Sequence, residues 1–183
     1  MTSILVLMVI VLLLVLANGF FVAAEFAIVG AQRTIIEHHA TKGNRLARRV
    51  AHILKSPVRV NRYIATTQLG ITVTSLGLGM YGEYTLAEWL VVRLELLGIT
   101  RLIAAHALAF IVAIAVLTYL HIVLGEMVPK ALALQRANRV VLYLSPVIET
   151  IERALLPLII GLEGIGNGLL RLAGVTSQET KAE

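Results

Sequence analysis

The chain has 183 residues, enough for one domain, and 58% of them are hydrophobic, with a mean hydropathy of +0.86. A soluble domain is nearer half apolar and has no long uncharged runs, so the composition indicates an integral membrane protein. The formal net charge is +5, and the absence of cysteine excludes disulfides and thiolate metal sites. A basic belt beside apolar segments is more typical of contact with anionic lipid than with nucleic acid.

The first predicted transmembrane helix covers residues 4–29. Its first fourteen residues carry no polar side chain, and Asn18 and Gly19 then interrupt the apolar run. As a helix the segment would be about 39 Å long, which crosses a hydrocarbon core of about 30 Å with some tilt. A secretory signal peptide would place basic residues before a shorter apolar run, so we expect a retained span.

Residues 32–62 differ sharply from their surroundings. They hold eight of the sixteen Lys and Arg residues and one acidic residue, Glu37. Apolar residues recur there at roughly helical spacing, Gly43-Asn44 is typical of a turn, and Ser56-Pro57 is typical of a helix end. The pattern predicts a helical hairpin on the cytoplasmic membrane surface, with a solvated loop as the alternative.

Two further apolar segments follow the hairpin. Residues 63–81 carry several hydroxyl side chains and three glycines, a composition common where transmembrane helices pack closely. Residues 102–128 are almost entirely apolar up to Gly125 and form the third predicted span. The connection at 82–101 has mixed charge and one Trp, which suits an outer interfacial segment.

The last predicted helix covers residues 138–173 and contains Pro146 and Pro157. Its scattered charges favour a kinked amphipathic helix lying along the membrane interface as a juxtamembrane belt. The Lys and Arg bias places 32–62 in the cytoplasm and 82–101 outside. The prediction is therefore an all-α, multi-pass protein of the cell membrane, with three spans, its N-terminus outside and its C-terminal helix cytoplasmic.

Two carboxylates, Glu25 and Glu126, fall late in the first and third predicted spans. An ionisable group at membrane depth is by default a candidate functional residue, although either could instead reach the headgroups or cap a helix. Pro129 has no N–H and its ring disturbs the carbonyl four residues earlier, which belongs to Gly125. Broken helices that expose backbone oxygens coordinate cations in transporters, so Glu126 and Gly125 are predicted ligands.

Asn18-Gly19 is a second expected weak point, in the first span. Thr72 and Ser75 share one face of the second span and offer hydroxyl oxygens. Carboxylate, hydroxyl and carbonyl oxygens without sulfur favour Mg²⁺ over zinc or copper. We interpret His106 and His121, which are fifteen positions apart, as packing or interfacial residues. No nucleophile–base pair or phosphate loop is present, so we do not expect an enzyme.

Three motifs carry a family resemblance: "NGFFVAAEFAIV" (18–29), "YIATTQLGITVTSLGLGMYGE" (63–83) and "LHIVLGEMVPKALALQ" (120–135). They resemble, in the same order, the transmembrane domain of the CorC/CNNM family of Mg²⁺ transporters. The resemblance covers essentially the whole chain. It implies a homodimer in which each protomer has three spans, a cytoplasmic hairpin, a belt-like helix and one Mg²⁺ site.

The resemblance also implies which residues bind the ion. Gly125 and Glu126 match the family's "GE..PK" element, and Ser75 falls where the second-span motif supplies a polar ligand. The first span often has serines where this chain has Val22, Ala23 and Ala24, so we expect carbonyl oxygens of Ala23 or Ala24 in their place. Full-length members usually continue into CBS domains, which this sequence does not contain; it is either part of a longer chain or a short member.

The predicted function is export of Mg²⁺, with Na⁺ exchange as the coupling that the resemblance suggests. Two alternatives stay open. One is a membrane sensor or assembly platform in which the cation is structural, and the other is a transporter of another cation.

Overall fold

The structure is a computed structural model that describes residues 2–83, 85, 86, 88, 89, 92 and 103–172. Every regular element in this part of the chain is helical, as predicted. The chain divides into two compact units. Unit 1 comprises residues 1–23 and 69–135, and unit 2 comprises residues 24–68 and 136–183. Most of the predicted outer connection at 82–101 lies outside the described residues.

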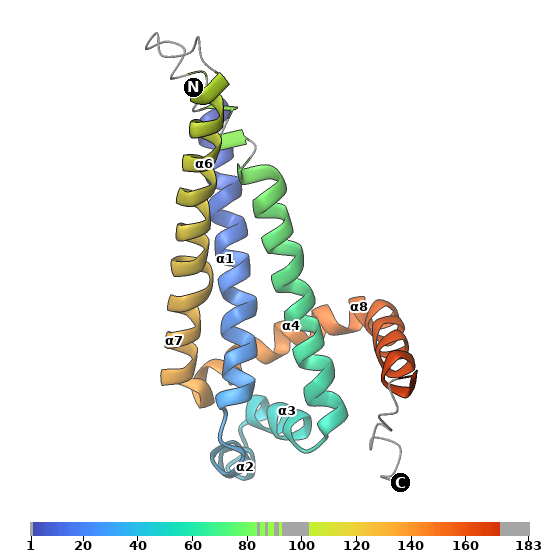
Figure 1. The fold of residues 1–183 in the computed structure, drawn as a ribbon. Helices are drawn as coiled ribbons and strands as arrows, with labels where there is room; N and C mark the ends of the chain where they lie inside the picture. Colours follow the sequence, from blue (N-terminus) through green and yellow to red (C-terminus); the bar gives the residue numbers. More distant parts are fainter. Residues whose placement is uncertain (1, 84, 87, 90–91, 93–102, 173–183) are drawn as a thin grey trace. The chain divides into compact units, whose positions relative to one another are not determined.

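Unit 1 contains the third of three helical rods and parts of the other two, which continue into unit 2 (Figure 1). The first is α1 (Thr2–Gly30), and the second is α4 (Pro57–Gly77) continued by the π-helical turn η1 (Leu78–Glu83). The third joins α6 (Ile103–Leu120), the π-helix η2 (His121–Met127) and α7 (Val128–Gln135).

Glycines let these rods approach closely. A Cβ built on Gly70 would lie 2.4 Å from Cδ1 of Phe21, and one on Gly19 would lie 2.9 Å from Cγ of Pro129. Both distances are shorter than real side-chain contacts, so the side chains of neighbouring rods occupy the space that a larger residue would need. Small residues at helix contacts are a recurring feature of membrane bundles, as the composition of 63–81 predicted.

Two stretches of the described chain are long and apolar enough to cross a membrane: Leu5–Gly30 and Phe110–Gln135. They overlap the first and third predicted spans. The predicted second span, 63–81, is continuously helical but does not reach the same level of hydropathy, so its role as a span stays a prediction.

One expectation for the first span is wrong. The helix does not break at Asn18-Gly19, because α1 is continuous from Thr2 to Gly30. The polar side chain of Asn18 is accommodated by hydrogen bonds to neighbouring rods, as described below, and the backbone therefore keeps its regular helical bonds.

Unit 2 contains the predicted helix–turn–helix, now seen as α2 (Arg33–Thr41) and α3 (Arg45–Leu54). Gly43 has φ of 91°, a left-handed conformation that favours glycine. Asn44 caps α3, because its side-chain oxygen accepts hydrogen bonds from the backbone N–H groups of Leu46 and Ala47. Pro57 begins α4, where a missing N–H costs nothing. The helical hairpin is confirmed, and its place on the membrane surface stays a prediction.

The last helix, α8 (Ala137–Leu172), changes direction along its length (Figure 1) and contains Pro146 and Pro157. Burial and exposure of the apolar side chains recur every eleven residues, which is about three helical turns. Ala137, Ile148 and Ile159 are spaced in this way and are buried. Two series at the same spacing are exposed and apolar: Tyr143, Ala154 and Ile165, and Val147, Leu158 and Leu169. Buried and exposed apolar side chains therefore occupy fixed positions around α8 at a three-turn spacing, and the predicted amphipathic belt along the membrane interface stays a prediction.

Candidate cation site

A polar cluster lies among the apolar side chains of unit 1. Asn18 is only 2% exposed, and its side-chain amide Nδ2 donates a hydrogen bond to the carbonyl oxygen of Gly125 at 3.0 Å. Its Oδ1 accepts hydrogen bonds from the hydroxyls of Thr74 at 2.8 Å and Ser75 at 3.2 Å. Nε2 of His121 lies 3.4 Å from the Ser75 hydroxyl. We call these four side chains and the Gly125 carbonyl the Asn18 cluster.

The third rod reaches the cluster through an irregular turn. In η2 the N–H of Val128 bonds to the carbonyl of Val123, five residues back, as in a π-helix. Pro129, at the start of α7, has no N–H to offer the Gly125 carbonyl four residues earlier. The Asn18 amide donates to that oxygen in its place, which supports the prediction that Pro129 makes it available.

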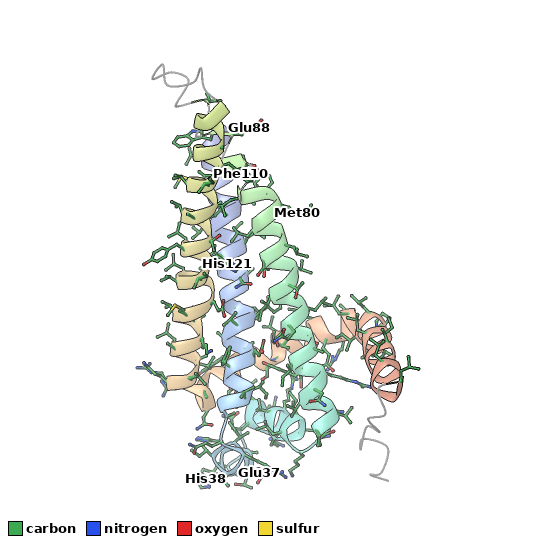
Figure 2. All side chains as sticks on the ribbon, viewed as in Figure 1. Glu37, His38, Met80, Glu88, Phe110 and His121 are labelled. Atoms are coloured by element: carbon green, nitrogen blue, oxygen red, sulfur yellow. The ribbon has the colours of Figure 1, made fainter. Side chains whose placement is uncertain are left out.

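Gly125 is also required by space. A Cβ at this position would lie 2.8 Å from Cδ2 of His121, so any larger residue would displace the imidazole. The histidine is thus held between Gly125 on its own helix and Ser75 on α4. His121 lies midway along its rod (Figure 2).

The structure brings together Asn18, Ser75 and Gly125 from the predicted ligand set. It adds Thr74 and His121, which the sequence analysis did not select. For His121 a signal was present, since a histidine four residues before Gly125 shares its helix face. For Thr74 there was none, because α4 carries several hydroxyls and the sequence does not say which one faces Asn18.

Other predicted ligands lie outside the hydrogen-bonded cluster. Thr72 is exposed. Ala23 and Ala24 lie inside the continuous α1, where backbone carbonyls take part in helical bonds, so either would have to leave that pattern to bind a cation. Glu126 follows Gly125 directly on η2 and is exposed. The roles of these residues stay predictions.

Glu25 belongs to unit 2. Its Oε1 accepts a hydrogen bond from Nε2 of Gln68 at 2.8 Å, while its Oε2 is buried and has no hydrogen-bond partner among the described residues. The sequence analysis did not foresee Gln68 as the neighbour of this carboxylate. No group of three or more His, Asp or Glu side chains gathers around a common point in the described chain. A cation site here would therefore depend on neutral oxygens with few carboxylates.

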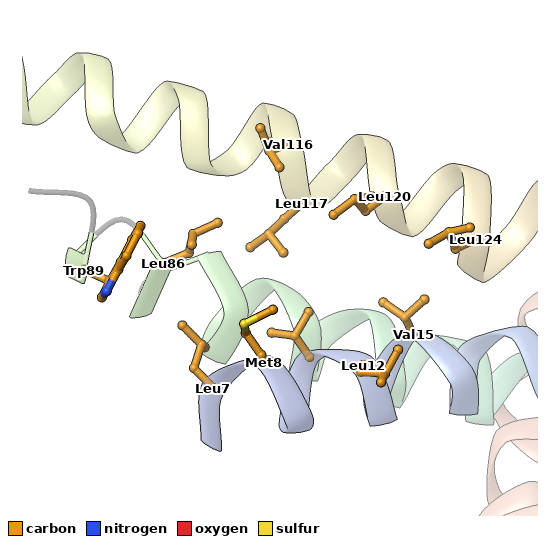
Figure 3. Close-up of a pocket in the computed structure, with 11 residues that line it drawn as sticks. Leu7, Met8, Leu12, Val15, Leu86, Trp89, Val116, Leu117, Leu120 and Leu124 are labelled. Carbon is orange, nitrogen blue, oxygen red and sulfur yellow. The ribbon is translucent and has the colours of Figure 1, made fainter. Parts of the chain in front are cut away.

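A cavity of about 360 Å³ also lies in unit 1 (Figure 3). Its lining side chains are apolar, from Leu7, Met8 and Val15 on α1 to Leu117 and Leu120 on α6, with the indole of Trp89 at one end. It offers no oxygen donor from a side chain. A dehydrated cation would find no side-chain oxygen there, so the Asn18 cluster is the better candidate.

Comparison with known proteins identifies the family of the chain. Residues 8–183 match the cyclin M transmembrane N-terminal domain family, CNNM. The chain belongs to this family. A CNNM transmembrane domain is by definition part of a membrane protein, and the two long apolar helices of this chain agree with that class.

Bacterial relatives of this CNNM chain include three similar proteins. It is 38% identical to the UPF0053 protein YhdT of Bacillus subtilis over 88% of its own length, and 32% identical to the UPF0053 protein sll0260 of Synechocystis over 92%. It is 34% identical over 92% of its length to the uncharacterized protein Rv1841c of Mycobacterium tuberculosis. The chain spans 34%, 37% and 46% of these relatives, respectively.

Proposed function

We propose that this protein exports Mg²⁺ across the cell membrane, and that the ion binds at the Asn18 cluster with Glu126 as its anionic ligand. The observation that carries the proposal is the cluster itself: buried oxygen donors meet at one point between apolar helices. The side-chain oxygen of Asn18, the hydroxyl of Ser75 and the carbonyl of Gly125 are hard ligands of the kind that Mg²⁺ prefers. Membership of the CNNM family favours the same ion.

The cluster can accept a cation by giving up one hydrogen bond. The hydroxyl of Ser75 donates to Asn18, and rotation of that hydroxyl would break this bond and free a lone pair on each of the two oxygens for an ion. The Gly125 carbonyl uses one lone pair for the Asn18 amide and keeps a second one. The hydrogen bonds would hold the oxygens in place before the ion arrives.

Neutral oxygens alone are insufficient for a divalent ion inside a membrane. They carry only dipoles, while the attraction between opposite charges strengthens steeply as the dielectric constant falls. Glu126 is the carboxylate next to the Gly125 carbonyl in the chain, and it is exposed in the single protomer. We propose that it completes the ligand set directly or through one water, because Mg²⁺ usually keeps several waters.

The proposed arrangement has three spans, with residues 32–62 and α8 in the cytoplasm. The rod formed by α4 and η1 runs from Pro57 to Glu83, about 40 Å at helical rise, which is long enough to cross a bilayer. Its low hydropathy has a physical explanation in the hydroxyls of Thr74 and Ser75, which pair with Asn18 inside the unit. We further propose a homodimer and coupling to Na⁺ exchange, both from the family.

The decisive variant is Glu126→Gln, which keeps the shape of the side chain and removes its charge. We expect Mg²⁺ binding, measured by calorimetry on the purified protein, to be abolished or greatly weakened, with expression and dimerisation unchanged. Glu88→Gln is the matched control, because Glu88 is an exposed carboxylate of the same unit. Binding by Glu126→Gln equal to that of the parent would leave Glu126 as a capping or headgroup-facing residue.

Flux distinguishes the proposed transporter from its alternatives. Purified protein in liposomes should move Mg²⁺ down an imposed gradient, and Glu126→Gln should not. Binding without flux would favour a sensor or assembly platform with a structural ion. Flux of another cation in the absence of Mg²⁺ movement would favour a different substrate.

A further inference from the structure

The imidazole of His121 is the one nitrogen ligand that the Asn18 cluster could offer, apart from the amide of Asn18, which has no basic lone pair. Its Nε2 lies 3.4 Å from Oγ of Ser75, and the same Oγ lies 3.2 Å from Oδ1 of Asn18. Three side chains from three different rods therefore bring a nitrogen and two oxygens into one series of contacts, with Ser75 Oγ in the middle.

The two separations centred on Ser75 Oγ are compatible with neighbouring ligands of a single ion. In an octahedral site with bonds of about 2.1 Å, neighbouring ligands lie about 3 Å apart. The two distances centred on Ser75 Oγ are slightly longer than that edge. An ion bound by Ser75 Oγ could therefore take the neighbouring His121 nitrogen as a second ligand with small movements, once the Ser75 hydroxyl rotates.

The π-helical turn adds the remaining candidates on the same side. Each backbone hydrogen bond in such a turn reaches five residues back rather than four. The helix position directly one turn after His121 therefore falls between Gly125 and Glu126, and both residues lie near the His121 face. Single π-helical turns inserted in longer helices often occur at functional sites. In a regular α-helix Glu126, five positions after His121, would be turned further from that face.

A nitrogen ligand changes which ions the site favours. Carbonyl and carboxylate oxygens suit Mg²⁺ and Mn²⁺ alike, whereas imidazole binds transition metals and is a poor ligand for Mg²⁺. We propose that Nε2 of His121 is a direct ligand of the bound cation, and that it makes the site bind Mn²⁺ more tightly than Mg²⁺. This inference deepens the proposed function, since it rests on the same site and specifies its ion selectivity.

The test uses Mn²⁺ as the probe, because pulsed electron paramagnetic resonance detects nitrogen bound directly to this ion. The full chain loaded with Mn²⁺ should show modulation from ¹⁴N, which changes to that of ¹⁵N when the protein carries ¹⁵N-histidine. His121→Gln should remove the signal. Glutamine can still form a hydrogen bond to Ser75, so this variant separates loss of the ligand from loss of the fold.

Competition between Mn²⁺ and Mg²⁺ gives the second readout. The ratio of Mn²⁺ affinity to Mg²⁺ affinity should fall about tenfold or more in His121→Gln, since even an outer-shell partner of a metal site is worth about tenfold. His52→Gln, at an exposed histidine of α3, should leave both the signal and the ratio unchanged.

Several outcomes would overturn the proposal: no Mn²⁺ binding, Mn²⁺ binding without nitrogen modulation, or modulation that persists in His121→Gln. If the protein binds and transports Mg²⁺ while bound Mn²⁺ shows no nitrogen modulation, only this inference fails. If Mn²⁺ binds through His121 while Mg²⁺ neither binds nor moves, the proposed Mg²⁺ export fails and the ligand assignment stands.

Discussion

Ser75 and Thr72 share a helix face by their spacing, yet the structure gives them different surroundings. Ser75 is half-buried and bonds to Asn18, while Thr72 is exposed. The two hydroxyls therefore form a matched pair on one helix, one inside the proposed ligand set and one outside it.

We expect Ser75→Ala to weaken Mg²⁺ binding while the dimer persists. Loss of one ligand should cost on the order of 1–3 kcal/mol, by analogy with a buried hydrogen bond left unmade. Thr72→Ala should have a much smaller effect. Calorimetric titration of both variants, with size determination in detergent, measures this difference. Equal affinity in Ser75→Ala and the parent would make Ser75 a packing residue, and a larger loss in Thr72→Ala would reverse the assignment.

Part of the cluster could be predicted from residues alone. Pro129 has a fixed chemical effect on the carbonyl four residues earlier, so Gly125 followed from the sequence. The spacing of His121 from Gly125 indicated a shared helix face, but the contacts of His121 and Thr74 with Ser75 and Asn18 did not follow from it. Those contacts depend on how η2 and α4 are rotated about their axes, and a change from α-helical to π-helical bonding alters that rotation.

At the scale of elements, the contact between α1 and α4 depends on a missing side chain. A Cβ on Gly70 would lie 2.4 Å from the ring of Phe21, which is far below an ordinary contact distance. The two helices would have to separate, or the ring would have to leave its position.

Gly70→Ala should therefore destabilise the protein by about 1–3 kcal/mol, the usual cost of overpacking. Thermal unfolding in detergent measures the loss. Phe21→Leu in the same chain should recover part of it, because leucine is smaller at the contact, and the double-mutant cycle should show coupling between the two positions. Additive effects of the two substitutions would mean that the helices do not meet at this contact.

The packing of α8 has a predicted dependence on pH. Burial raises the pKa of Glu152 above its ordinary value, and the negative charge of Glu149 adds to the rise, although Arg62, Arg59 and Arg153 oppose it. A carboxyl group with a raised pKa in the folded state favours folding while it is protonated. That contribution is present below the ordinary pKa of 4.5 and is lost as the pH rises through the raised value.

Glu152→Gln should consequently be more stable than the parent at neutral pH and should lose this part of the pH dependence. Unfolding measured between about pH 4 and 7 tests the expectation, since the two proteins should converge toward the acidic end. If the parent instead became more stable relative to Glu152→Gln as the pH rises, the expectation would be wrong. That result would indicate that the neighbouring arginines affect the carboxylate more than burial does.

At the scale of the whole molecule, the helical elements were predictable because their signals are strong and local. Long apolar runs, a Gly-Asn turn and a proline at a helix start each determine the nearby backbone, and all appear in the structure. The membrane role of residues 63–81 was harder to judge from hydropathy. The hydropathy index lowers the score of a helix equally for a hydroxyl that is hydrogen-bonded inside a unit and for one that is exposed.

The basic hairpin should lie in the cytoplasm. Residues 32–62 carry eight Lys and Arg residues, against two in 82–101. The chain has no cysteine, so a single cysteine introduced at exposed His39 or exposed Glu88 gives an unambiguous report. An impermeant reagent added to intact cells should label position 88 and not position 39. Labelling at 39 would reverse the topology and with it the proposed direction of transport.

The two prolines of α8 lie on nearly the same face of the helix, because eleven residues make almost a whole number of turns. A proline bends a helix away from its own side, so two bends in phase add within one plane and produce a bow rather than a zigzag. The curvature therefore depends on the number of residues between the two prolines. One residue inserted between Pro146 and Pro157 would rotate the second bend by about 100° about the axis and turn the planar bow into a twisted one. Loss of a proline would leave only one of the two bends. The segment between the prolines should thus tolerate substitutions far better than insertions or deletions.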